Sequence, residues 1–362
     1  MGEPVKVGLV GCGTIAKQYL RTIGEQPRLR LTAAADLDPA RARAVADATP
    51  GVRALTVEEL VADPEVDVVL NLTVPAAHAH VAHLAIAAGK DVYGEKPLAV
   101  TTTEAREVLD AAAAAGVRVA CAPDTVLGTG VQTARAAIDS GAIGRPSAAV
   151  ATMISAGPER WHPDPDFYYV AGGGPLMDMG PYYITALVTL LGPVTSVVGA
   201  AARARATRVI GSGPRAGQTI PVSVDTHVTG ALTHESGAMS TLVMSFDAVA
   251  TRAPNIEVHG DRGSLVVPDP NRFDGEVLLC ELSGDGWRTL PVGGGYAQAG
   301  RGVGLADLAA TPPDVEPRAG GRLAFHVLDV MEALLASARS GQAVAVSSTC
   351  ERPRPVPYGQ TP

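Results

Sequence analysis

A glycine-rich turn near the N-terminus is the first feature of the sequence that could bind a ligand. Gly11, Gly13 and Ala16 follow a short apolar run and open a segment with helical spacing. Two glycines allow a tight turn and a close approach of the backbone to a diphosphate, and a small third residue lets the helix pack closely on the strand. The amides of a helix N-terminus favour anionic phosphate. The pattern therefore predicts a dinucleotide-binding turn over residues 11–16, which includes Thr14 and Ile15.

An acidic residue at the end of the second apolar run extends this pattern. Asp36 stands where the second strand of such a fold would end. Its carboxylate could accept hydrogen bonds from ribose hydroxyls and would repel a 2′-phosphate, so NAD is favoured over NADP as the cofactor. The alternative is a solvated acid at a strand end.

A lysine after the fourth apolar run could supply proton chemistry. The sequence has few lysines, and one of them lies in the segment Glu95-Lys96-Pro97. Because the carboxyl ends of parallel strands line the ligand crevice, Lys96 would lie beside the nicotinamide. Free lysine has a pKa of about 10.4, so base chemistry near neutral pH requires burial or a nearby cation to lower it. The alternative is a surface ion pair made by Glu95.

The elements that would position these residues alternate along the first third of the chain. Apolar runs that predict strands span 5–10, 29–35, 66–72, 91–94 and 117–120. Segments that predict helices span 14–25, 39–48, 77–88 and 103–115. Strands that alternate with helices indicate a parallel sheet with right-handed crossovers, covered on both faces.

The pattern changes after residue 123. Helical periodicity recurs over 130–140, 177–191 and 322–340, and a hairpin is predicted from 226–233 and 240–246 around a glycine turn. We therefore predict an α/β protein. A Rossmann domain with a doubly wound parallel sheet spans 1–122. An α+β domain with a mostly antiparallel sheet, for substrate binding and oligomerisation, spans 123–345, and an irregular tail spans 346–362.

A third motif makes a family resemblance specific. The segment from Gly172 to Tyr182, Gly-Gly-Gly-Pro-Leu-Met-Asp-Met-Gly-Pro-Tyr, follows the glycine turn and the Glu95-Lys96-Pro97 segment in chain order. Together the three motifs resemble the Gfo/Idh/MocA oxidoreductases, which include glucose–fructose oxidoreductase and inositol dehydrogenase, over about residues 5–340. The resemblance implies an NAD(P)-dependent dehydrogenase or reductase that acts on CH–OH groups of sugars, cyclitols or keto-sugars.

The resemblance also implies roles for residues outside the glycine turn. The implied catalytic residues are Lys96, Asp178 and Tyr182. The implied cofactor contacts are Thr73, Pro75 and His78 after the third predicted strand, and Glu95 toward the ribose. Asp178 and Tyr182 are four residues apart and so share one face of a helix. Whether Lys96 or Tyr182 is the acid–base stays open, as do a dipole-complementing role for Asp178 and a core role for Tyr182.

Three further residues are candidates for substrate binding beside Lys96, Asp178 and Tyr182. Asp124 lies where the sequence departs from the family's pattern, and it could bond a hydroxyl or cap a helix. Trp161 and His162 could line a substrate cleft, or Trp161 could be the packing anchor of a proline-braced loop.

The composition argues against other classes of partner. The net charge of −8 disfavours nucleic acid and anionic membranes, which need a basic surface. The four cysteines form no close pair, and the histidines at 78, 80 and 83 are expected on an exposed helix face, so no metal site is predicted. We find no signal peptide and no apolar run of about 20 residues, and we expect a cytoplasmic protein.

Two other functions share the same motifs. One is a redox-neutral, NAD-dependent glycoside-cleaving enzyme of the same family, and the other is a non-catalytic sensor of a sugar or of NAD. We also expect a homodimer or homotetramer, formed through the sheet of the second domain, because residues 242–244 are apolar on both sides of their strand.

Overall fold

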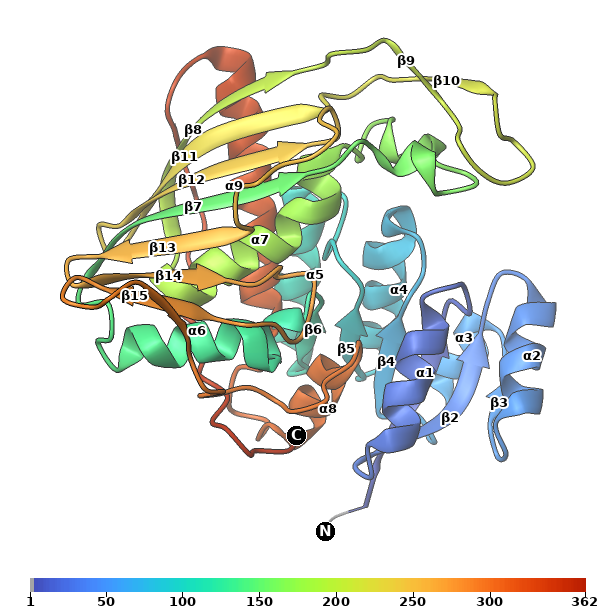
Figure 1. Ribbon diagram of the computed structural model, residues 1–362. Coiled ribbons are helices and arrows are strands. Elements are labelled where there is room, and N and C mark those ends of the chain that lie inside the picture. Colours follow the sequence, from blue (N-terminus) through green and yellow to red (C-terminus); the bar gives the residue numbers. More distant parts are fainter. Residues whose placement is uncertain (1–2) are drawn as a thin grey trace. The chain divides into compact units, whose positions relative to one another are not determined.

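The computed structural model describes residues 3–362 and divides into two compact units (Figure 1). The first unit contains the chain up to residue 127 together with 296–328 and 359–362, and the second contains 128–295 and 329–358. The sequence prediction placed everything after residue 122 outside the first domain. The chain instead returns to the first unit twice, so the first unit is discontinuous in sequence.

The first unit is built on a six-stranded parallel sheet with the strand order β3-β2-β1-β4-β5-β6. Its strands are β1 Val5–Val10, β2 Leu29–Ala35, β3 Arg53–Ala54, β4 Val68–Asn71, β5 Asp91–Gly94 and β6 Val119–Cys121. Its helices are α1 Ala16–Glu25, α2 Pro39–Ala48, α3 Val57–Ala62, α4 Pro75–Ala87, α5 Thr102–Ala115 and α8 Val303–Ala310. The strand order reverses between β1 and β4, which is the switch point where ligands bind in doubly wound folds. The predicted Rossmann sheet is confirmed.

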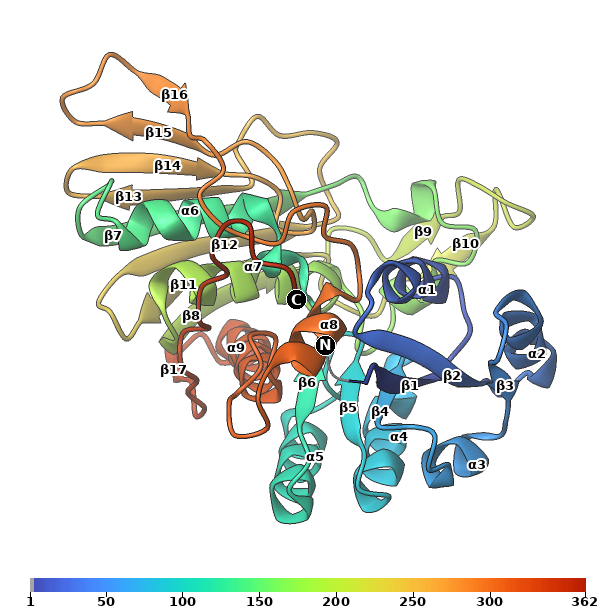
Figure 2. The ribbon, with the colours of Figure 1, turned by 90° about the horizontal axis from the view of Figure 1, so that it is seen from below.

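Helices cover both faces of this sheet, as the apolar strands require. Figure 2 shows α1 and α8 on one face and α4 and α5 on the other. Helix α1 buries Tyr19 and Ile23 at helical spacing, and α8 adds Leu305 and Leu308 to the same hydrophobic cluster. No sequence pattern predicted α8, which brings part of this core from a distant segment of the chain.

The second unit contains a nine-stranded sheet with the order β16-β15-β14-β13-β7-β12-β11-β8-β17. Its strands are β7 Pro146–Ile154, β8 Val194–Ala202, β11 His227–His234, β12 Met239–Ser245, β13 Ile256–Gly260, β14 Gly263–Val267, β15 Leu278–Glu281, β16 Trp287–Thr289 and β17 Val344–Ala345. Strand β7 pairs in parallel with β12, and the other neighbouring pairs of described strands are antiparallel. The mostly antiparallel sheet and the β11–β12 hairpin are confirmed.

Helices pack on one face of this sheet, as Figures 1 and 2 show. They are α6 Thr129–Asp139, α7 Pro175–Leu191 and α9 Gly321–Ser340, of which α9 begins in the first unit and ends in the second. A short hairpin of β9 Thr207–Val209 and β10 Thr219–Pro221 stands apart from the large sheet and follows β8. Within residues 3–362, no helix combines the length and apolar character needed to cross a bilayer.

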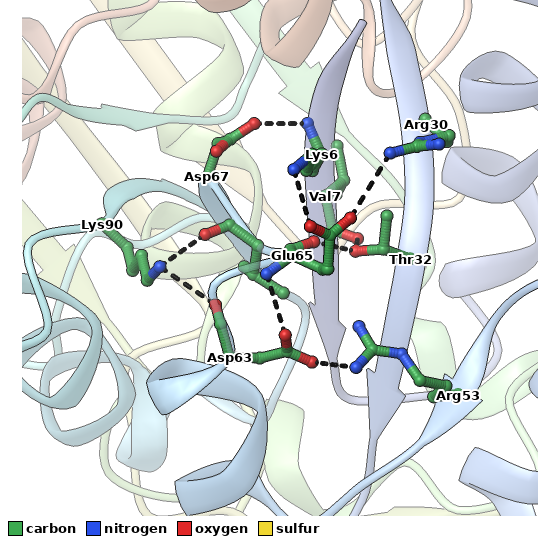
Figure 3. Close-up of polar contacts among 10 residues, drawn as sticks. Lys6, Val7, Arg30, Thr32, Arg53, Asp63, Glu65, Asp67 and Lys90 are labelled. Atoms are coloured by element: carbon green, nitrogen blue, oxygen red, sulfur yellow. Dashed lines mark hydrogen bonds and ion pairs between the residues drawn. The ribbon is translucent and has the colours of Figure 1, made fainter.

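A polar network stabilises the edge of the first sheet at which β1 and β4 begin (Figure 3). Lys6 Nζ donates to Glu65 at 2.9 Å, and the backbone amide of Lys6 donates to Asp67 at 2.9 Å. Lys90 Nζ donates to two carbonyl oxygens in the loop before β4, at 3.1 Å for Asp63 and 2.6 Å for Val66. Two of the few lysines therefore hold the α3–β4 loop at the edge opposite the strand ends where ligands bind.

We predict that Lys90→Met lowers the free energy of unfolding of the first unit by about 1–3 kcal/mol, because two carbonyl groups lose their charged donor. Lys17→Met, on an exposed position of α1, is the matched control and should change it little. Urea unfolding followed by circular dichroism measures the difference. Equal stability of the two variants would show that water replaces the ammonium group at no cost.

Candidate active site

The turn between β1 and α1 brings its backbone against the end of β4. Gly11 has a φ of +96°, and a methyl group added there would lie 2.6 Å from the carbonyl group of Leu72. Only glycine fits this position. A methyl group at Gly13, by contrast, would meet no protein atom within 4 Å. The turn is therefore tightly packed at Gly11 and open at Gly13.

The open side of the turn fits the diphosphate of a dinucleotide. The N-cap residue of α1 is Ile15, whose side chain accepts no hydrogen bond from the amides of the first helical turn. Ala16 is buried, as the predicted close contact between helix and strand requires, and Thr14 is exposed. A helix start of this kind offers donors and a positive dipole end to an anion.

Asp36 lies at the end of β2, and its carboxylate is held by the backbone. Oδ2 accepts the Cys12 amide at 2.7 Å, and Oδ1 accepts the Asp38 amide at 2.9 Å. Each oxygen keeps a lone pair for a ribose hydroxyl, and the negative charge opposes a 2′-phosphate. Burial, with Asp36 nearby, raises the pKa of Cys12 to about 11, so Cys12 remains a thiol at neutral pH.

The loop after β4 is joined to the segment after β5 by a buried histidine. The His78 ring nitrogens lie against two carbonyl oxygens, Nδ1 at 2.6 Å from Pro97 and Nε2 at 3.0 Å from Thr73. His78 is 2% exposed, so the expectation that it lies on an exposed helix face is wrong. Helix α4 begins at Pro75, where the missing amide costs nothing. His78 therefore positions Thr73 and the turn that contains Lys96.

Asn71, the last residue of β4, is a site residue that the sequence analysis missed. Its Nδ2 donates to the His78 carbonyl at 3.0 Å, and its Oδ1 accepts the Thr73 hydroxyl at 2.7 Å. A polar amide at the end of an otherwise apolar strand was the signal that could have identified it. Asn71 and His78 together fix the loop at the carboxyl end of β4.

Glu95 contacts a buried tyrosine rather than a surface cation. Its Oε1 accepts the Tyr19 hydroxyl at 2.8 Å, and its Oε2 accepts the Lys96 amide at 3.0 Å. The interpretation of Glu95 as a surface ion pair is therefore wrong. These bonds set the direction of the chain at Lys96, which is half-buried directly after β5.

Asp124 is fully buried and serves the first unit as a cap. Its Oδ2 accepts the amides of Gly302 at 2.8 Å and Gly304 at 3.0 Å, at the start of α8. Burial raises the pKa of Asp124, while these amides oppose the rise. The structure thus supports the capping alternative over a substrate contact, because solvent does not reach the side chain. The helix it caps is not the one that follows it in sequence.

In the second unit, Asp178 and Tyr182 lie in the first half of α7. The glycine segment before α7 packs on the preceding loop, where a methyl group at Gly173 would lie 2.5 Å from the carbonyl oxygen of Phe167. The Asp178 amide donates to Gly174 at 3.0 Å, which places Asp178 in the first turn. Tyr182 follows one turn later and is buried. Both side chains therefore share one face of α7, as their spacing predicts.

Trp161 and His162 lie in the loop before α7. Trp161 is 64% exposed, with its ring edge-to-face against His162 at 5.4 Å between centroids. The alternative in which Trp161 is the packing anchor of this loop is therefore wrong. Among residues 3–362, histidine, cysteine, aspartate and glutamate side chains form no group of three that could hold a metal ion.

Comparison with known proteins assigns the chain to a family. Residues 5–122 match the family model described as an oxidoreductase family with an NAD-binding Rossmann fold, and residues 131–266 match the GFO/IDH/MocA C-terminal domain. The chain is 31% identical over 274 residues to the 1,5-anhydro-D-fructose reductase of Ensifer adhaerens, which covers 72% of this chain and 74% of that protein. The chain belongs to the Gfo/Idh/MocA family.

This family member is similar to other oxidoreductases along most of its length. It is 27% identical over 288 residues to an inositol 2-dehydrogenase of Rhizobium meliloti, which covers 80% of this chain and 82% of that protein. A crystal structure of an NAD-binding oxidoreductase from Klebsiella pneumoniae has a TM-score of 0.80 and 29% identity, and it covers 95% of this chain and all of that one. The chain is thus an NAD-dependent oxidoreductase, and the residues of the β1–α1 turn and Asp36 fit the cofactor.

The two glycines of the turn give a paired prediction. Gly11→Ala should destabilise the first unit and abolish NADH binding, because the methyl group would overlap the backbone after β4. Gly13→Ala should keep the stability of the parent and weaken NADH binding at least tenfold, because its methyl group would occupy the space of the diphosphate. Thermal unfolding and titration by NADH fluorescence measure the two effects. Tight NADH binding by Gly13→Ala would place the diphosphate elsewhere.

Proposed function

We propose that this chain transfers a hydride between NAD and the carbinol or carbonyl carbon of a sugar, cyclitol or keto-sugar. The observation that carries the proposal is the position of Lys96, at the carboxyl end of β5 on the sheet edge that also holds the glycine turn and Asp36. The names of the relatives, inositol 2-dehydrogenase and 1,5-anhydro-D-fructose reductase, support this class of substrate.

In this mechanism bound NAD supplies the hydride acceptor for oxidation, and its reduced form supplies the donor for reduction. Lys96 and Tyr182 bind the reacting oxygen of the substrate, and one of them takes the hydroxyl proton during oxidation. Asp178 accepts a hydrogen bond from a neighbouring hydroxyl group of the polyol.

A redox-neutral glycoside-cleaving enzyme and a non-catalytic sensor would use the same cofactor turn. A panel of aldoses, uronates, inositols and keto-sugars with NAD(H) and NADP(H) separates these functions from the proposal. A net change in nicotinamide absorbance supports the dehydrogenase or reductase. Cleavage of a glycoside without that change, or binding without any turnover, would replace it.

We predict that Lys96→Met and Tyr182→Phe each lower kcat by about 10²–10⁴-fold, because each removes a group that binds the reacting oxygen and takes part in proton transfer. NADH affinity should stay within a few-fold for Tyr182→Phe. Tyr183→Phe is the matched control, since Tyr183 is the adjacent buried tyrosine and its hydroxyl accepts a hydrogen bond from Asn255 at 2.8 Å. Its turnover should be unchanged. Full turnover by both Lys96→Met and Tyr182→Phe would exclude them as the acid–base pair.

We further propose a homodimer formed through the helix-free face of the nine-stranded sheet. A row of cross-strand partners, Val150, Thr241, Ala231 and Val198, runs over that face on four adjacent strands. Val198 is 53% exposed and Val150 is 38% exposed. A second copy would bury this mostly apolar row by a two-fold contact, in which the same patch of both copies meets.

Val198→Glu should shift the mass in solution from dimer to monomer, or from tetramer to dimer, because it places a charge in the apolar row. Val249→Glu, in an exposed loop after β12, is the control and should leave the mass unchanged. Light scattering at micromolar concentration measures both. A parent chain that is monomeric would rule out this interface.

A further inference from the structure

A buried charge cluster in the second unit joins the β9–β10 hairpin to the loop that carries Trp161. Arg208 of β9 donates from Nη1 to Glu159 at 3.1 Å and to the Phe246 carbonyl at 3.1 Å, and from Nη2 to Asp247. The Arg208 side chain is 2% exposed. Charges buried this deeply persist only when they are paired and hydrogen-bonded. Removal of one partner therefore leaves the remaining charges uncompensated. The cluster thus couples β9 to the loop.

Tyr169 is the second partner of Glu159. Its hydroxyl donates to Oε2 of Glu159, and its ring lies under the Arg208 guanidinium at 5.4 Å. Burial, assisted by Glu159, raises the pKa of Tyr169, so the phenol stays protonated and donates. The backbone repeats the link, because the Gly211 amide donates to the Glu159 carbonyl at 2.7 Å. Arg208 therefore acts on both ends of the loop, at Glu159 and at Tyr169.

The turn between β9 and β10 also contacts this loop, at the surface. Arg215 donates from Nη1 to Asp166 at 2.6 Å and to Asp164 at 3.2 Å. These aspartates alternate with the two prolines that follow His162. The hairpin thus contacts the loop both in the interior and at the surface.

The loop leads directly into the start of α7. The carbonyl of Tyr168 accepts the Gly174 amide at 2.7 Å, and the Tyr169 carbonyl accepts the Ser223 amide at 2.9 Å. The carbonyl of Gly174 in turn accepts the Asp178 amide at 3.0 Å. The buried cluster is therefore linked to the turn that carries Asp178 by hydrogen bonds and by the peptide bond between Tyr168 and Tyr169.

We propose that Arg208 is a positioning residue for the reaction, which holds the Trp161–His162 loop and the first turn of α7 in place through Glu159 and Tyr169. The inference rests on the proposed function, because it assigns Asp178 and Tyr182 to the reacting groups. Arg208 touches no substrate in this scheme. A displacement of about 1 Å at a reacting group costs on the order of 100-fold in rate, which gives a remote residue a large effect.

The test uses one tryptophan as a reporter of the loop. The chain has two tryptophans, so Trp287→Phe leaves Trp161 alone. In that background, Arg208→Met should lower kcat about 10–100-fold and raise the acrylamide quenching of Trp161, with the Kd for NADH unchanged. Arg208→Lys should restore part of both values, since it keeps the charge. Arg288→Met removes an exposed pair with Glu281 at 2.9 Å and should change neither value.

The outcomes separate this proposal from the proposed function. A folded Arg208→Met variant with the kinetic constants and Trp161 quenching of its parent overturns the positioning role. If circular dichroism shows that this variant is unfolded, Tyr169→Phe, which removes only a hydroxyl, decides by the same two measurements. If the parent neither oxidises a polyol nor reduces a keto-sugar, the proposed function fails. The acrylamide quenching of Trp161 in the parent and in Arg208→Met then still tests whether Arg208 holds the loop in place, because this measurement needs no turnover.

Discussion

The first unit depends on one close backbone contact, between the turn after β1 and the end of β4. The turn packs on Leu72 and Thr73 so tightly at Gly11 that no side chain fits there. Because these strand ends meet, the segments after β1, β2, β4 and β5 lie along one edge of the sheet. Backbone groups and short side chains then fix one another, as Asp36 does with Cys12 and His78 does with Thr73. The result is an edge whose donors and acceptors are in place before a ligand arrives, which limits the reorganisation that binding requires.

The second unit fixes the loop before α7 by a different means. There the fixed points are charges: Arg208 lies between two carboxylates in the interior, and Arg215 lies between two at the surface. A buried charge cluster is a weak source of net stability compared with an apolar core of the same volume, but it tolerates little change in geometry. It therefore suits a loop that keeps one conformation while its aromatic side chains stay exposed.

The lysines of the first unit lie at both edges of its sheet. Lys6 and Lys90 stabilise the edge where β1 and β4 begin, and Lys96 lies at the opposite edge.

The sequence alone predicted the Rossmann sheet, because it follows from local patterns, whereas the roles of the motif residues stay predictions. Apolar runs, helix periodicity and glycine spacing are readable over a few residues, and β1, β2, α2 and β5 match the predicted bounds. Most failures are contacts between distant segments, although β3 and α3 were also missed, because two and six residues carry little pattern. Asp124 reads as a polar loop residue, yet its partners are the Gly302 and Gly304 amides. His78 reads as an exposed helix residue until the Pro97 carbonyl is placed beside it. Helix α8 was missed because eight residues after a glycine-rich stretch carry little periodicity, and Arg208 was missed because nothing near it in sequence indicates burial.

The return of the chain to the first unit has a consequence for its biosynthesis. Leu305 and Leu308 of α8 complete the hydrophobic cluster around Tyr19, and they follow β6 by nearly two hundred residues. Domains generally fold as units while the ribosome is still extending the chain. The first unit cannot complete its hydrophobic cluster in this way, because α8 is made only after residues 128–295 of the second unit have been translated. The part of the hydrophobic cluster that α8 covers therefore lacks this helix until residues 303–310 have been synthesised.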